Sequence, residues 1–229
     1  DSNERDEAIS RNARGILDNL EFIKLHLAYR NLRFKDQARL AQRGSLTEDE
    51  MIAKQAEILV EKKALIARTQ TFINNNPDFK VIEQPDSTYL VTNADLYYNL
   101  AELQYAVNLN NPQEALESYR KVVQLGPNFA HRDAALYNIG FISSQQKRLQ
   151  IDQNRNRFYE LNSNALALDD ASKYKYGDFA EAIESYQGIV DNYKDSEYYD
   201  EALYRMGVLN YYLATDSDQP ARYYSLATN

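Results

Sequence analysis

Apolar residues in the first part of the chain recur with the spacing of long amphipathic helices. Intervals of three and four residues predict a first long helix with one apolar stripe. Arg43-Gly44-Ser45 interrupts this pattern, and Ser45 and Thr47, followed by three acids, predict a capped helix start. The stripe of the first helix consists of Ala13, Ile16, Leu20, Ile23, Leu27 and Phe34.

The second helix carries pairs of apolar residues every seven positions, which is typical of a coiled-coil-like face. The pairs are Met51/Ile52, Ile58/Leu59, Leu65/Ile66 and Phe72/Ile73, and Asn74-Asn75-Asn76-Pro77 ends the pattern. Residues 1–78 are therefore expected to form a long antiparallel helical hairpin. Residues 79–92 are expected to be an irregular connector, with Asn93 capping the next helix.

From residue 93 onward the chain repeats itself. One block places an aromatic residue, a large apolar residue and a small residue at matching positions, in the segments ending at Ala101, Gly140 and Gly207. A second block, Glu114 to Val123, is repeated at residues 181–190. The small residues predict close helix approach.

These blocks resemble the tetratricopeptide-repeat family, whose unit is a helix–turn–helix of 34 residues. The resemblance implies that Ala115 and Ala182 pack reciprocally against the small residues of the preceding helices. The fold class predicted is all-α, a hairpin followed by an α-solenoid of about three repeats. In residues 93–229 the spacing predicts an insertion at 146–173 in the middle repeat and a truncated last repeat, whose second helix would start at Pro220.

Composition narrows the function. A net charge of −8 disfavours binding to the phosphate backbone of nucleic acids. There is no cysteine for a disulfide or a thiolate metal site, and no apolar run is long enough to span a bilayer. The two histidines, His26 and His131, lie far apart, and no nucleophile–base or phosphate-binding motif is present. We expect no metal, no cofactor and no enzymatic activity.

The far half of the first helix is basic, and this patch has two interpretations. It could bind an acidic partner or lipid headgroups, or it could be neutralised by acids of the returning helix, Glu48, Asp49, Glu50 and Glu57. Neutralisation is the prediction, because an antiparallel hairpin places these acids opposite the patch. The basic residues are Lys24, Arg30, Arg33, Lys35, Arg39 and Arg43.

The resemblance implies a concave surface built from the first helix of each repeat. Its ligand-facing side chains would be mainly aromatic, which suits binding of a peptide or helix from another protein. The alternative is that the tyrosines are ordinary packing residues of the repeats. The candidate groove residues are Tyr98, Glu102, Tyr105, Tyr137, Asn138, Phe141, Tyr204, Arg205, Val208 and Tyr211.

Some family members grip a terminal carboxylate with lysine, asparagine and arginine. Asn138 and Arg205 match that pattern, but Glu102 and Glu201 would repel a carboxylate, so this role is not predicted. The predicted function is a non-enzymatic scaffold for other proteins. The rival is a self-assembly module that oligomerises through the hairpin or the last repeat. A hairpin before such repeats is similar to bacterial envelope proteins, which implies a periplasmic location, with the cytoplasm as the alternative.

Overall fold

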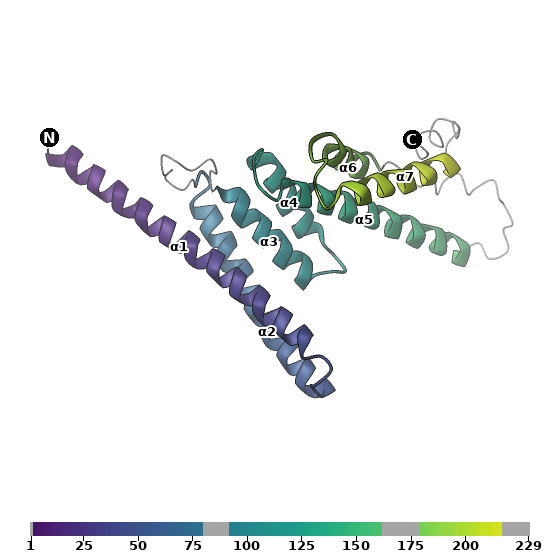
Figure 1. Ribbon diagram of the computed structural model, residues 1–229, viewed down its shortest axis with the longest axis horizontal. Helices are drawn as coiled ribbons and strands as arrows, with labels where there is room; N and C mark the ends of the chain where they lie inside the picture. The colour runs from purple at the N-terminus through teal and green to yellow at the C-terminus, as the bar shows by residue number, and fades with distance from the viewer. Residues whose placement is uncertain (1, 80–91, 162–178, 217–229) are drawn as a thin grey trace. The chain divides into compact units, whose positions relative to one another are not determined.

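The computed structural model describes residues 2–79, 92–161 and 179–216 (Figure 1). The elements in these ranges are seven helices: α1 (Ser2–Ala41), α2 (Glu48–Asn75), α3 (Asn93–Val107), α4 (Gln113–Leu125), α5 (Arg132–Leu161), α6 (Ala180–Asn192) and α7 (Tyr199–Asp216). The prediction of an all-α fold is confirmed. The chain divides into two compact units, residues 1–129 with α1 to α4 and residues 130–229 with α5 to α7.

The first unit has one core that joins the hairpin to α3. Helix α1 contributes Phe22, Leu25, Tyr29 and Leu32, which pack against residues of α2 and α3 such as Leu65. The hairpin is thus continuous with the helices that follow it. The predicted domain boundaries stay a prediction, since the connector lies mostly outside the described residues.

Capping residues start α2 and α3. The cap of α2 is the residue that the sequence indicated, and the cap of α3 is one residue earlier than predicted. The Thr47 hydroxyl accepts a hydrogen bond from the amide of Glu50, and the Glu50 carboxylate accepts one from the amide of Thr47. The same reciprocal cap starts α3, but its residues are Thr92 and Asp95. Asn93 is the first residue of α3, not its cap. Its buried side-chain amide donates instead to the carbonyls of Asn76 and Pro77, directly after α2.

The apolar stripe predicted for α1 lies on the face opposite the core. The buried residues Phe22, Leu25, Tyr29 and Leu32 also follow three-four spacing, so α1 has two apolar faces. The buried face carries the aromatic rings of Phe22 and Tyr29, which pack with residues of α2 and α3. Phe79 stacks on Phe22. The stripe residues from Ile16 to Phe34 are about half exposed or more.

The prediction that acids of α2 neutralise the basic patch holds for Glu57, but it missed the acid that forms the ion pair. The pKa of Lys35 is raised by its hydrogen bond to Glu61 and, further, by the charge of Glu57. Lys35 pairs with Glu61 rather than with the acids at the start of α2. Asp36 of the basic helix itself accepts from Arg39 and from Lys62 of α2, and these contacts hold its pKa below the ordinary value although burial opposes the shift. The acids at residues 48–50 instead stabilise the start of α2, where the helix dipole favours them.

The second unit packs α6 against α5 and α7. Its buried residues include Ile139 and Ile142 of α5, Tyr186 and Ile189 of α6, and Leu209 of α7. Helix α5 continues to Leu161, so the first part of the predicted insertion extends this helix. The rest of the insertion and the region of Pro220 lie outside the described residues.

The small residues of the repeat blocks lie at helix contacts, as close approach requires. Ala101, Ala115 and Ala182 are almost completely buried, and Gly140 is buried as well. A Cβ atom at Gly140 would lie 2.7 Å from the ring of Tyr186. Only glycine therefore fits there without movement of the tyrosine. Gly207 is half-buried among the described residues.

Candidate protein-interaction site

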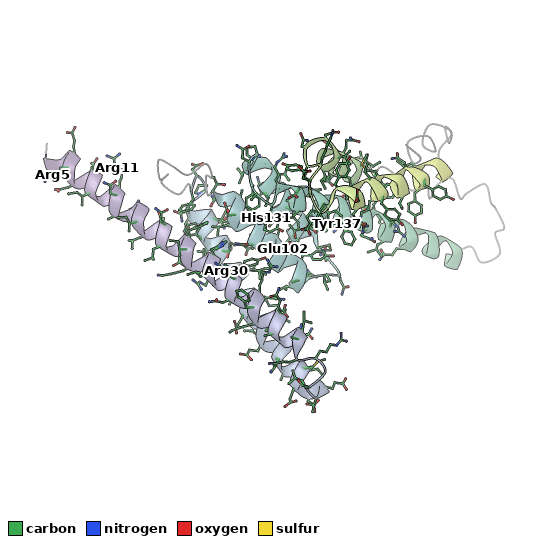
Figure 2. The ribbon with its side chains drawn as sticks, viewed as in Figure 1. Arg5, Arg11, Arg30, Glu102, His131 and Tyr137 are labelled. Atoms are coloured by element: carbon green, nitrogen blue, oxygen red, sulfur yellow. The ribbon has the colours of Figure 1, made fainter. Side chains whose placement is uncertain are left out.

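The candidate groove residues of the first repeat lie on α3, where Figure 2 labels Glu102, and two of them contact Tyr119 of α4. The Tyr98 ring packs against Tyr119, with ring centroids 6.1 Å apart, and against Phe129 at 5.5 Å. The Glu102 carboxylate accepts a hydrogen bond from the Tyr119 hydroxyl. Tyr98 and Glu102 thus both have a packing role within the repeat.

Helix α1 lies beside the same part of α3. Tyr29 of α1 is buried, and its pKa is raised to about 12 by burial and then by the negative charge of Glu102. A small cavity of about 180 Å³ lies between the helices and is lined by Arg33, Lys62 and Glu102 among others. Tyr105, the third candidate on α3, is half-buried.

Three candidate residues of the second unit, Tyr137 and Phe141 of α5 and Arg205 of α7, form an aromatic–arginine cluster. Tyr137 stacks on Phe141 with ring centroids 6.3 Å apart and on Tyr198 at 4.8 Å. Its hydroxyl accepts a hydrogen bond of 3.1 Å from Nε of Arg205. Tyr186 of α6 lies beneath, with its ring 6.0 Å from that of Tyr137.

Arg205 covers this cluster. Its guanidinium carbon lies 4.9 Å from the ring centroid of Phe141 and 5.5 Å from that of Tyr137, within the range of cation–π attraction. The Nη2 atom of Arg205 forms a 2.7 Å ion pair with Glu201, one turn earlier on α7. The guanidinium is thus held in place by three side chains. It covers one face of the Phe141 ring, and Phe141 is half-buried.

One face of α7 carries exposed aromatic surface. Tyr204 is 66 % exposed and Tyr211 is 53 % exposed, and the half-buried Val208 lies between them at helical spacing. Further along, the Arg148 guanidinium of α5 lies 5.2 Å from the ring centroid of Tyr212. Asn138 is half-buried on α5. The face suits contact with apolar side chains, framed by two arginines.

Sequence reasoning missed three members of this cluster. Glu201 stands four residues before Arg205, and this spacing alone predicts an ion pair on a helix. Tyr186 stands at the same position of the repeated block as Tyr119, which marks it as a packing residue. Tyr198 lies in the turn before α7, where periodicity gives no signal. As candidates for partner contact, the groove residues stay a prediction.

Residues 2–79, 92–161 and 179–216 contain neither a metal-binding cluster of side chains nor a helix that could span a membrane. No group of three or more acidic or histidine side chains there has a geometry that could hold a metal ion. None of the helices in these ranges is apolar over a length sufficient to cross a bilayer. His26 Nδ1 lies 3.4 Å from the amide nitrogen of Asn99, and His131 is exposed in the turn before α5.

The repeated helical hairpins define a helical-repeat protein. Residues 134–196, from α5 to the turn before α7, match the tetratricopeptide-repeat family model. The family predicted from the repeated blocks is confirmed. Neither the search of curated proteins nor the search of solved structures found a match. The predicted bacterial and periplasmic location gains no support and stays a prediction.

Repeats of this family generally mediate contacts between proteins, and they are typically interaction modules without catalytic activity. The chain is therefore expected to have protein partners.

Proposed function

We propose that the chain is a non-enzymatic scaffold, and that a peptide or helix of a partner binds the face of α7 that carries Tyr204, Val208 and Tyr211. The supporting observation is the exposure of two tyrosines of α7 beside an ordered aromatic–arginine cluster, whose rings Tyr137 and Phe141 lie in the matched residues 134–196. Large aromatic side chains supply much contact area for little loss of conformational entropy, and they are common anchors at interfaces.

The two repeats differ in how far their candidate residues are available. On α3, Tyr98 and Glu102 contact Tyr119 and lie near α1, so a partner there would have to displace internal contacts. On α7, Tyr204 and Tyr211 present most of their rings to solvent. The proposal therefore centres on α7, with Tyr137, Phe141 and Arg205 as a rigid base.

The ordered base favours binding in a further way. Arg205 is held by Glu201, Tyr137 and Phe141, so its side chain loses little freedom when a partner covers it. A partner carboxylate near Arg205 would compete with Glu201. The face thus favours an apolar or aromatic segment over a strongly acidic one.

The test combines capture with a matched control. Tyr204→Ala with Tyr211→Ala should reduce partner capture from a lysate of the source organism at least about thirtyfold, and the melting temperature should stay unchanged. Leu203→Ala is the control, because Leu203 is 42 % exposed on the same helix but points to another face. Capture that survives the double substitution, or that Leu203→Ala removes equally, would show that this face is not the site.

A further inference from the structure

A stripe of apolar residues, interrupted by Arg30, runs along the solvent face of α1. Its members are spaced four, three, four and three residues apart over 25 positions, which is the seam of a coiled coil. The members are Ile9, Ala13, Ile16, Leu20, Ile23, Leu27, Arg30 and Phe34. The six large apolar side chains among them are 46–65 % exposed.

This stripe does not belong to the hairpin core. The core residues Phe22, Leu25, Tyr29 and Leu32 lie on the opposite side of α1, against α2 and α3. At 1.5 Å per residue the stripe is about 38 Å long. Single exposed apolar residues are common on protein surfaces, but a continuous stripe of this length is typical of an interface. One helix of the unit thus presents two complete apolar seams, and its own unit covers one of them.

The first turns of α1 depend on this stripe. All described side chains of residues 4–14 are exposed, and in Figure 1 the start of α1 extends past the end of α2 within the same unit. An isolated helix of this length is marginal in water, because tertiary packing supplies most helix stability. A second helix along the stripe would supply that packing.

The charge pattern along α1 indicates which helix would pack on the stripe. Residues 2–21 hold five acids and three arginines, a net charge of −2, whereas residues 22–41 hold five cations and one acid, a net charge of +4. Two copies that run antiparallel bring the acidic half of each helix against the basic half of the other. Parallel copies would place like charges together, including Arg30 opposite Arg30, which is unfavourable.

The antiparallel arrangement also has a consistent register. With its twofold axis between Leu20 and Ile23, Leu20 meets Ile23 of the second copy, and Ile16 meets Leu27. Ile9 then meets Phe34, and Arg30 meets Ala13, whose small side chain leaves room for the arginine to reach water along the seam. Each helix thereby covers the whole stripe of the other.

We propose that the exposed face of α1 binds a second copy of this chain, so that two α1 helices form an antiparallel coiled-coil dimer. The proposal does not depend on the partner face of α7, because the two surfaces share no residue and are tested by different variants.

Sedimentation velocity of the full chain over a range of concentrations tests the dimer. The wild-type chain should shift from monomer to dimer as concentration rises. Leu20→Asp with Ile23→Asp should raise the dimer dissociation constant about 100-fold or more, because each copy would bury two charges at the axis. Ile52→Asp is the control: Ile52 is 60 % exposed on α2 near the hairpin turn and off the stripe.

Oxidative crosslinking tests the orientation, and the chain has no native cysteine to interfere. A mixture of the Ile9→Cys and Phe34→Cys variants should form a disulfide-linked heterodimer, whereas neither variant alone should crosslink. Crosslinking of each variant with itself would overturn the antiparallel register. A wild-type chain that stays monomeric, even if it binds vesicles or another protein, or a dimer that survives Leu20→Asp with Ile23→Asp, would overturn the proposal.

Discussion

The helix pairs α3–α4 and α5–α6 have matching sequences but hold their central tyrosine in different ways. Tyr119 and Tyr186 stand at the same position of the repeated block, and both are almost completely buried. The Tyr119 hydroxyl donates to Glu102. The Tyr186 hydroxyl has no hydrogen bond among the described residues; Ser144 lies near enough to affect its pKa but not in hydrogen-bond geometry.

A change at two neighbouring positions accounts for the difference. Ala101-Glu102 of α3 corresponds to Gly140-Phe141 of α5. Phenylalanine cannot accept a hydrogen bond from the tyrosine, and glycine lets the backbone of α5 approach the Tyr186 ring closely. Phe141 is then available to carry Arg205 on its ring. The first repeat thus uses this position for its own stability, and the second uses it to build a surface cluster.

The largest expected effect concerns a property that the two tyrosines share. Burial raises the pKa of Tyr119 and of Tyr186 above the ordinary value near 10, and it raises that of Tyr29 to about 12. In the unfolded chain these tyrosines ionise near pH 10, whereas in the folded chain they keep their protons to higher pH. The free energy of unfolding therefore has its full value below about pH 10 and falls as the pH rises above it. Each tyrosine contributes a slope of about 1.4 kcal/mol per pH unit.

Urea denaturation at pH 9, 10 and 11 measures this slope. Tyr119→Phe and Tyr186→Phe should each remove about one tyrosine's share of it, because phenylalanine does not ionise. An unchanged slope in either variant would contradict the burial of that hydroxyl.

The second prediction concerns the close packing of α5 and α6 at Gly140. Gly140→Leu should lower the free energy of unfolding by about 3 kcal/mol, because even a Cβ atom there would overlap the Tyr186 ring. Gly44→Leu is the control, since a Cβ atom at Gly44 in the hairpin turn meets no atom within 4 Å. Thermal melting measures both variants, and equal melting temperatures for the two would contradict the close approach of α5 and α6.

The third prediction uses the hydroxyls at neutral pH. Tyr119→Phe should cost about 2 kcal/mol, because it removes a hydrogen bond to a carboxylate. Tyr186→Phe should cost about zero, since it removes a buried hydroxyl without a hydrogen bond in the described structure. Denaturation at pH 7 gives both values, and a larger cost for Tyr186→Phe would reverse the comparison.

The smallest expected effect lies one residue before each tyrosine. The Ser118 hydroxyl donates to the buried side-chain oxygen of Gln104 on α3 at 2.7 Å, whereas Ser185 donates to the carbonyl of Glu181 in its own helix. Ser118→Ala should therefore cost about 1 kcal/mol and Ser185→Ala about zero. The same denaturation assay resolves the pair, and equal costs would show that the contact with Gln104 adds no stability.

The sequence predicted the helices, the cap at Thr47 and the small residues at helix contacts. These features depend on residues close in the chain or on repeated blocks, so a single sequence carries them. The sequence did not predict which face of α1 is buried, because both faces have the same three-four spacing. Only the positions of α2 and α3 decide which face they cover. The pairing of Lys35 with Glu61 was missed for a similar reason, since it depends on the register between two helices.

At the candidate site the sequence located the aromatic residues but not their roles. Tyr98, Tyr137 and Tyr204 occupy equivalent positions, yet Tyr98 packs on Tyr119 and Phe129, Tyr137 accepts from Arg205, and Tyr204 is exposed. The difference comes from neighbours contributed by other helices, which composition and spacing do not specify.

Helix α1 is continuous for 40 residues but is supported along only part of its length. Its amide hydrogens should therefore exchange with deuterium in a graded manner, slowest near Leu25 and Tyr29 and close to free-peptide rates before Arg14. In a monomer this gradient reports where tertiary support ends along one helix. Slow exchange that extends to Ile9 would instead mean that another helix lies along that segment.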